Sequence, residues 1–147
     1  MFGKILFPVD LSENMYKIQP VVIEMADKFN SEIHCVYCLH VAMYYSHIGL
    51  SVAYVADFEN QARAEVEKKL KKFTAENFQG RRIHSKILSG RPGDEIVRYI
   101  HSENMDLVVM GHSSTGIERA LLGSVAAHVV KYSPVPVMVI SPGVLKD

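Results

Sequence analysis

The feature that most constrains the fold is a pair of short, almost unbroken apolar runs in the second half of the chain. "DLVVM" (106–110) and "VPVMVI" (135–140) carry almost no polar side chains. A strand with one face in water alternates apolar and polar residues, whereas a strand buried on both faces has no such alternation. The two runs therefore predict parallel strands with helices on both faces of the sheet.

Strand-like and helix-like segments alternate along the chain. Short β-rich runs are separated by stretches in which apolar residues recur every three or four positions. This alternation predicts right-handed crossovers that wind outward in both directions from the first strand. The expected strands lie within 3–10, 32–41, 81–90, 105–111 and 135–141, and the expected helices within 12–30, 58–78, 91–104 and 118–133.

Two of the expected helices have a clear apolar face. In the longer one, Glu65 and Glu67 stand four positions before Lys69 and Lys71, so two ion pairs are expected on its polar face. Ser12 is a natural N-cap for the first helix. The expected apolar faces are Ile18, Val22, Met25 and Phe29 in the first helix and Phe58, Ala62, Val66, Leu70 and Phe73 in the longer one.

Length and charge limit the classes of protein. The 147 residues, 48% of them apolar, are about enough for one domain, and we expect 1–147 to form it. The 16 lysines and arginines balance 16 acids, which leaves no net field to hold nucleic acid or an anionic membrane. No apolar run approaches the roughly 20 residues that span a bilayer, and no signal-peptide core precedes Asp10. A cytoplasmic protein is expected.

Cys35 and Cys38 form a C-x-x-C pattern inside an expected strand. Redox motifs of this kind place the first thiol at a helix N-terminus, where the thiolate is stabilised. In a strand, residues three apart point to opposite faces, which is poor geometry for a disulfide or a shared metal. We expect both thiols to serve packing.

The seven histidines are scattered, with no i,i+4 pair on a helix and no carboxylate at ligand spacing. We therefore expect no dedicated metal site. His112 stands apart because it lies in the polar turn after the fourth expected strand, where its charge would decide whether it binds or repels a phosphate.

Two polar turns follow strands that should be neighbours. "PVD" ends the first expected strand and "GHSSTG" follows the fourth. Ligands of open parallel sheets bind at the carboxyl ends of the strands where the winding reverses. Small residues before a helix let backbone amides approach a phosphate, but sheets of this class need such turns whether or not they bind anything. Both interpretations stay open at this level.

Four blocks in order give the chain a resemblance that covers nearly its whole length. "KILFPVDLSE", "IHCVYCLHV", "SGRPGDEIVRYIHSENMDLVVMG" and "LLGSVAAHVVKYSPVPVMVI" together resemble the universal stress protein family. The resemblance implies a single-domain, Rossmann-like α/β fold with an open five-stranded parallel sheet in the order 3-2-1-4-5. It also implies a homodimer joined through the C-terminal strand.

The ATP-binding branch of that family has a glycine after the fourth strand, a second glycine three positions later, and a closing Gly-Ser or Gly-Thr pair. The first glycine and the closing pair are present here, but Ser114 replaces the second glycine and the loop is one residue shorter. By resemblance, Pro8, Val9 and Asp10 border the base and ribose of ATP or AMP, Val41 and Met110 flank the adenine, and Gly111, Ser114, Gly123, Ser124 and Val125 take the phosphates, with any Mg²⁺ held by those phosphates.

The same residues have simpler interpretations. Asp10 and Ser124 can cap helices, and Val41, Met110 and Val125 can belong to the core. The apolar, tyrosine-rich segment 42–57 is long for a loop in a compact domain, and a lid over the cleft, a contact for another chain and a fold back onto the domain are all open.

The function implied is a universal stress protein, an adenine-nucleotide-binding regulator in stress adaptation. The alternative is a protein of the same fold that does not bind nucleotide and acts through a protein partner. No residues pair a general base with a nucleophile, so an enzyme is not expected. Slow ATP hydrolysis or autophosphorylation on Ser113 or Ser124 is the open exception.

Overall fold

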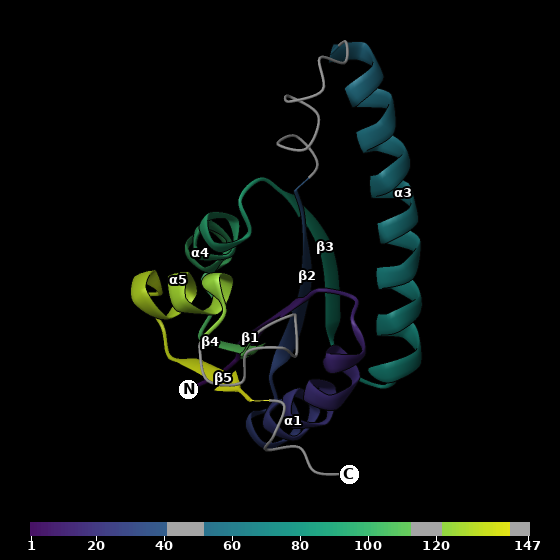
Figure 1. Cartoon of the computed structure of the whole chain (residues 1–147). Coiled ribbons are helices and arrows are strands. Elements are labelled where there is room, and N and C mark those ends of the chain that lie inside the picture. Colours follow the sequence, from purple (N-terminus) through teal and green to yellow (C-terminus); the bar gives the residue numbers. More distant parts are fainter. Residues whose placement is uncertain (41–51, 113–121, 142–147) are drawn as a thin grey trace.

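Five parallel strands form the core of the molecule (Figure 1). The computed structural model describes residues 1–40, 52–112 and 122–141. Within them the strand order is β3-β2-β1-β4-β5, and every neighbouring pair is parallel. The predicted α/β fold and strand order are confirmed. The elements are β1 (Lys4–Val9), α1 (Glu13–Phe29), β2 (Glu32–Leu39), α3 (Val52–Asn77), β3 (Ile83–Ser89), α4 (Pro92–Glu103), β4 (Leu107–Gly111), α5 (Ser124–Tyr132) and β5 (Val137–Ile140).

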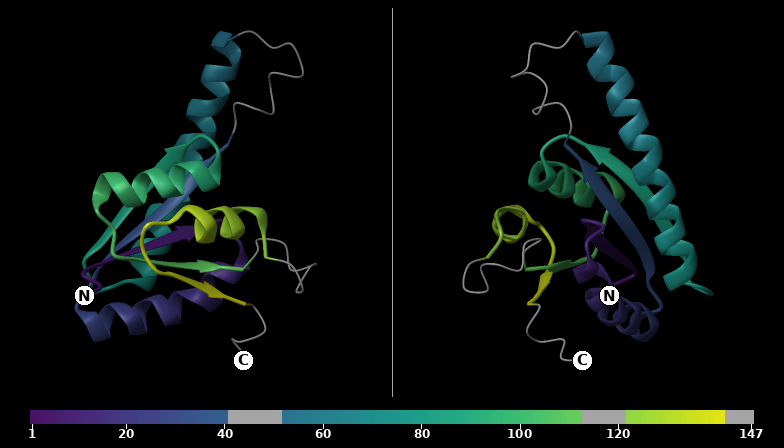
Figure 2. Two further views of the ribbon diagram at one scale, coloured as in Figure 1. Left: turned by 90° about the vertical axis from the view of Figure 1, so that its left-hand side faces the viewer. Right: turned by 45° about the vertical axis from the view of Figure 1, so that its right-hand side comes forward.

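Helices cover both faces of the sheet (Figure 2). Ile5 and Phe7 of β1 pack in a cluster with residues of α1 and α3, whereas Leu6 packs in a second cluster with residues of α4 and α5. All three side chains are fully buried. Ile5, Leu6 and Phe7 are therefore apolar in succession because a helical layer covers each face of β1. Among the described helices, none has the length and apolar character needed to cross a membrane.

The two apolar runs differ in burial. Leu107 to Met110 of β4 are buried throughout, as predicted for a strand covered on both faces. In β5 only Ile140 is buried, and Val137 to Val139 are half-buried. The prediction of full burial was wrong for β5 because the strand lies at the edge of the sheet, where one side has no neighbouring strand. Its edge position was predicted correctly.

Helix α3 starts earlier than predicted. It begins at Val52, so its first turns take up part of the segment 42–57 that was expected to be a loop, and 42–51 lie outside the described residues. The N-terminal half of α3 extends beyond the sheet (Figure 1). Leu70 and Phe73 are buried as expected, but Phe58 is 45% exposed because it lies in this half. The predicted Glu65–Lys69 and Glu67–Lys71 ion pairs are present, at 3.4 and 3.2 Å.

The buried face of α1 is rotated from the predicted one. Ile18 and Val22 are buried as expected, but Phe29 is 41% exposed and packs edge-on against Phe2, with ring centroids 5.1 Å apart. Met25 is only half-buried. The buried positions are Met15, Ile18, Val22 and Ala26, a stripe with helical spacing that starts one turn earlier than the predicted one.

Cys35 and Cys38 point to opposite faces of β2, as predicted. Cys35 belongs to the cluster under α1 and α3, and Cys38 packs against the cluster under α4 and α5. Both thiols are free. Burial raises the pKa of Cys35, and burial together with the nearby Glu95 carboxylate raises the pKa of Cys38 to about 12.

These shifts predict slow alkylation of the native protein. A pKa of about 12 in place of 9.0 leaves about 1000-fold less Cys38 thiolate at pH 8. Higher intrinsic nucleophilicity offsets part of this loss, so iodoacetamide should modify native Cys38 roughly 30-fold or more slowly than the unfolded chain. Mass spectrometry over time, with guanidinium-unfolded protein as the control, measures both rates. Equal rates at pH 8 would contradict the burial described here.

Candidate functional site

A cavity of about 360 Å³ opens at the carboxyl ends of β1 and β4. β1 is the strand from which the chain winds in both directions, with β2 on one side and β4 on the other. This is the place where open parallel sheets bind their ligands. Eight of the residues predicted for the nucleotide line this cavity: Pro8, Val9, Asp10, Met110, Gly111, Gly123, Ser124 and Val125.

The other two predicted residues, Val41 and Ser114, lie outside the described residues, as do Ser113 and the rest of 113–121. Their part in the site stays a prediction. His112, singled out from the sequence for its place in the turn after β4, lines the cavity. Several lining residues on β2, α1 and α4 were not predicted. Register could have indicated those on β2, because Val36 and Tyr37 pair with Pro8 and Val9 of the predicted turn. The residues that were not predicted include Asn14, Met15, Ile18, Val36, Tyr37, Cys38, Pro92 and Ile96.

The wall of the cavity on the α4 side of the sheet is apolar. Val36 is almost fully buried, and Ile96 and Met110 are 2% and 5% exposed. They come from β2, α4 and β4, so three separate elements build one apolar surface. A flat apolar group, such as a purine ring, fits such a wall better than a charged group does.

Asp10 organises the turn after β1. Its Oδ1 accepts hydrogen bonds from the backbone N–H of Ser12, at 2.9 Å, and from the Ser12 hydroxyl, at 2.6 Å. Ser12 occupies the predicted N-cap position of α1. Its hydroxyl makes no hydrogen bond to the helix, so the position was predicted correctly but the capping bond is not formed. Between them Leu11 has a φ of 60°, an unfavourable conformation for leucine. Strained backbone of this kind gathers at functional sites.

The opposite rim is the N-terminus of α5. Gly123 is the N-cap, and its N–H donates to the carbonyl of His112 at 2.9 Å. Ser124 is the first helical residue and is exposed, so its interpretation as the N-cap was wrong. Helix α5 was predicted from 118, but Leu122 and Gly123 are not helical, and 118–121 lie outside the described residues. The first-turn amides have no helical acceptor and carry the positive end of the helix dipole.

Gly111 allows α1 to approach the end of β4. A Cβ atom placed on Gly111 would lie 2.9 Å from Cδ1 of Ile18. His112, the next residue, donates its N–H to the carbonyl of Ile140 at 2.9 Å. The backbone of β4 is thus fixed between α1 and β5 where it reaches the cavity.

Charged groups are few around the cavity. Within the described residues, no lysine or arginine lines it, and Asp10 is the only carboxylate that does. The groups available to an anion are therefore neutral donors and one imidazole. They include backbone amides, the Ser124 hydroxyl, the side chains of Asn14 and Tyr37, and the imidazole of His112. Helix N-termini bind phosphates through amides of this type.

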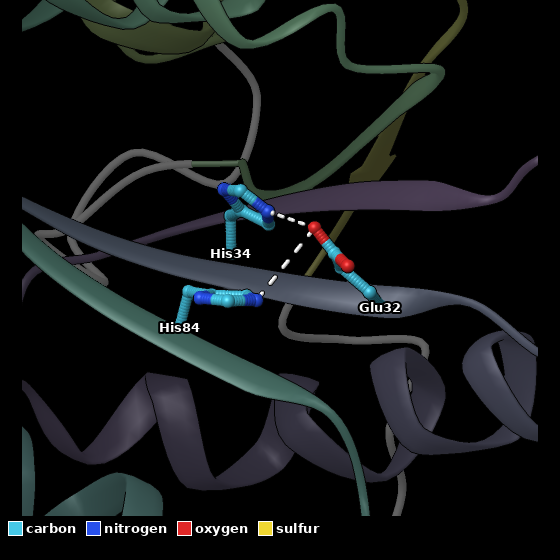
Figure 3. A group of neighbouring side chains, drawn as sticks. All are labelled: Glu32, His34 and His84. Atoms are coloured by element: carbon cyan, nitrogen blue, oxygen red, sulfur yellow. Dashed lines mark hydrogen bonds and ion pairs between the residues drawn. The ribbon is translucent and has the colours of Figure 1, made fainter.

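A second group of polar residues lies at the other end of β2 (Figure 3). Glu32, His34 and His84 present potential metal-binding atoms within 4.8 Å of one another. The expectation that no carboxylate stands at ligand spacing from a histidine was wrong for this group, because it considered only helical spacing. Glu32 and His34 are two apart in a strand and share a face, and His34 pairs in register with His84 of β3.

Comparison with known proteins agrees with this architecture. Residues 1–141 match the universal stress protein family. Universal stress protein MJ0531 of Methanocaldococcus jannaschii is 34% identical over 95% of this chain and 82% of its own. The solved structure of MJ0577, from the same organism, aligns with a TM-score of 0.82 at 26% identity, over 95% of this chain and 96% of that one.

Two more distant structures share the fold and were solved with adenine nucleotides. One is a universal stress protein in complex with cAMP, at 19% identity and a TM-score of 0.69. The other is the universal stress protein from Archaeoglobus fulgidus in complex with dAMP, at 19% identity and a TM-score of 0.68. The alignments cover 95% of this chain, with 96% of the first protein and 99% of the second.

Proposed function

The chain belongs to the universal stress protein family, and from this premise we propose that it is a cytoplasmic regulatory module that binds an adenine nucleotide, AMP or ATP. The observation that carries the proposal is the convergence of Pro8, Val9, Asp10, Met110 and Gly111 with the N-terminus of α5 around one cavity. Its volume of about 360 Å³ is within the range of small-molecule sites.

The base fits the apolar wall on the α4 side of the sheet, and the ribose fits beside the turn after β1. The adenine ring packs on Val36, Ile96 and Met110, which offer a buried apolar wall. The Asp10 carboxylate lies at the rim, where it can accept hydrogen bonds from the ribose hydroxyls, as acidic residues do in other nucleotide-binding sheets. Oδ2 of Asp10 takes no part in the two bonds that hold the turn.

The phosphate belongs at the N-terminus of α5. The amides of Val125 and Ala126 and the hydroxyl of Ser124 are donors at the positive end of the helix dipole. These groups suit a monophosphate. The relatives solved with cAMP and dAMP support this assignment, since both ligands carry one phosphorus atom. ATP brings two further phosphates, which would hold Mg²⁺ themselves.

The second candidate is a protein of this fold that acts through a partner without nucleotide. The replacement of a glycine by Ser114 and the missing residue between Gly111 and Gly123 favour it. The edge strand β5, with Val137, Met138 and Val139 half-buried, offers unpaired backbone to a second copy of the chain. Pairing of two β5 strands in a homodimer is compatible with both candidates.

Thermal unfolding with added nucleotide separates the two candidates. A ligand at 100 times its Kd stabilises the native state by about 2.7 kcal/mol, which corresponds to roughly 5–10 °C for a chain of this size. We expect AMP, and ATP with Mg²⁺, to raise the midpoint by that amount, and adenosine to raise it less. GMP at the same concentration is the control for base recognition. No shift with AMP or ATP at millimolar concentration would favour the second candidate.

A further inference from the structure

The group formed by Glu32, His34 and His84 lies on the α4 side of the sheet, away from the nucleotide cavity. Oε1 of Glu32 is 2.7 Å from Nε2 of His34 and 3.7 Å from Nε2 of His84. Both imidazoles therefore direct the same nitrogen toward one carboxylate oxygen, as Figure 3 shows. The two rings are 4.8 Å apart between centroids.

The sheet and α4 fix the side chain of His34, and the sheet fixes the backbone positions of His34 and His84. His34 is 5% exposed, and its Nδ1 lies 2.8 Å from the hydroxyl of Tyr99 on α4. His34 pairs in register with His84, so β2 and β3 hold the two Cα atoms as direct neighbours. The side chain of Glu32 is 22% exposed and that of His84 is 58% exposed, so water reaches the cluster from one side. The cluster thus has one buried side chain, His34, and is open to solvent at His84.

The electrostatics keep the carboxylate ionised. The hydrogen bond from His34 lowers the pKa of Glu32, burial opposes this effect, and the charges of His84, His34 and Lys4 lower it further. Burial, together with the charges of Glu103 and Glu32, raises the pKa of Tyr99 to about 12, so the Tyr99 hydroxyl keeps its proton at neutral pH.

We propose that Glu32, His34 and His84 form a binding site for a divalent transition-metal ion of the zinc class. Two imidazoles and one carboxylate are one of the donor sets that hold Zn²⁺ in three-ligand sites, where water fills the fourth position. Tetrahedral bonds of about 2.0–2.1 Å place ligand atoms about 3.3 Å apart. The separations between the ligand atoms of the three residues, from 2.7 Å up to 4.8 Å, bracket this value. The His84 ring is exposed and can rotate toward the ion.

Tyr99 completes the arrangement as a positioning residue. In a neutral His34 ring without metal, Nε2–H donates to Glu32, because an ionised carboxylate only accepts, and Nδ1 accepts from the Tyr99 hydroxyl. Metal binding at Nε2 requires the other tautomer, in which Nδ1–H donates to the hydroxyl oxygen of Tyr99. A hydroxyl serves either tautomer because it both donates and accepts. Metal-binding histidines usually have such a partner on their second nitrogen.

The test uses ZnCl2 as the probe on full-length protein that has been stripped of metal with a chelator and freed of nucleotide. Calorimetric titration in phosphate-free buffer should give one Zn²⁺ per chain. His84→Ala should weaken zinc binding by at least about 100-fold. Loss of a metal ligand lowers the affinity at least as much as loss of a residue that hydrogen-bonds to a ligand. Tyr99→Phe, which keeps all three ligands, should weaken it by about 10–100-fold.

His101→Ala is the matched control, because His101 is an exposed histidine on α4 outside the cluster. Its zinc affinity should equal that of the unchanged protein. Nitrogen-15 spectra of the histidine rings should show His34 shift to the Nδ1–H tautomer when zinc is added. Absence of zinc binding, or equal affinities of the unchanged protein and His84→Ala, would overturn the proposal. AMP titrations test the cavity between β1 and α5, and zinc titrations test the cluster of Glu32, His34 and His84. Failure of one proposal therefore leaves the other standing.

Discussion

Replacement of Ser124 by aspartate is expected to weaken the binding of AMP on the order of 100-fold without loss of fold stability. Ser124 is the exposed first residue of α5 and lines the cavity. A carboxylate about 5 Å from a phosphate costs about 3 kcal/mol at an effective dielectric constant of about 20. The same carboxylate stabilises a helix N-terminus by about 0.3–1 kcal/mol. Calorimetry measures the affinity, and urea unfolding measures the stability.

Ser124→Asn is the matched control because asparagine has the shape of aspartate without its charge. It removes at most one hydroxyl hydrogen bond, so the affinity for AMP should stay within about tenfold of the original. Equal weakening by the two substitutions would contradict the placement of the phosphate at α5, since a steric effect alone would then account for both results.

Phe73→Ala is expected to lower the free energy of unfolding by about 3–5 kcal/mol. Phe73 is 2% exposed and lies among the rings of Phe7, Phe78 and Tyr16, with centroids 6.4, 5.7 and 5.3 Å away. Removal of its ring opens a void where α3 packs on the sheet. Phe73 does not line the nucleotide cavity, so the affinity of the folded variant for AMP should be unchanged.

Phe58→Ala on the same helix is the comparison. Phe58 is 45% exposed, so its truncation should cost clearly less than that of Phe73. Urea unfolding of both variants at the same temperature gives the two values. A loss below about 1 kcal/mol for Phe73→Ala, or a larger loss for Phe58→Ala, would contradict the packing of α3 described here.

The strands and most helices could be predicted because the spacing of their apolar side chains follows the faces that are buried. Helix α4 was expected within 91–104 and spans Pro92–Glu103, since Pro92 starts it and its apolar residues recur with helical spacing. The early turns of α3 were missed because they extend beyond the sheet, where Tyr54 and Phe58 are exposed and give no buried stripe to the pattern. The buried face of α1 was predicted with the wrong rotation because Phe29, although apolar, is 41% exposed.

The two candidate sites differ in how much the sequence could reveal. The cavity proposed to bind a nucleotide follows from topology, because the turn after β1 and the start of α5 lie where the winding reverses. The cluster of Glu32, His34 and His84 depends on the register of β2 with β3, which a pattern search along one segment does not test. A search for histidine and carboxylate two positions apart in strands would have found Glu32 and His34.

Calorimetric titration of AMP into nucleotide-free protein shows whether this cavity binds an adenine nucleotide. We expect one site per chain for the unchanged protein, a retained site in Ser124→Asn and a loss of affinity on the order of 100-fold in Ser124→Asp. AMP and ATP with Mg²⁺ should compete for the same site. Absence of heat from AMP and from ATP at millimolar concentration, with the fold intact, would contradict the assignment of this cavity to an adenine nucleotide.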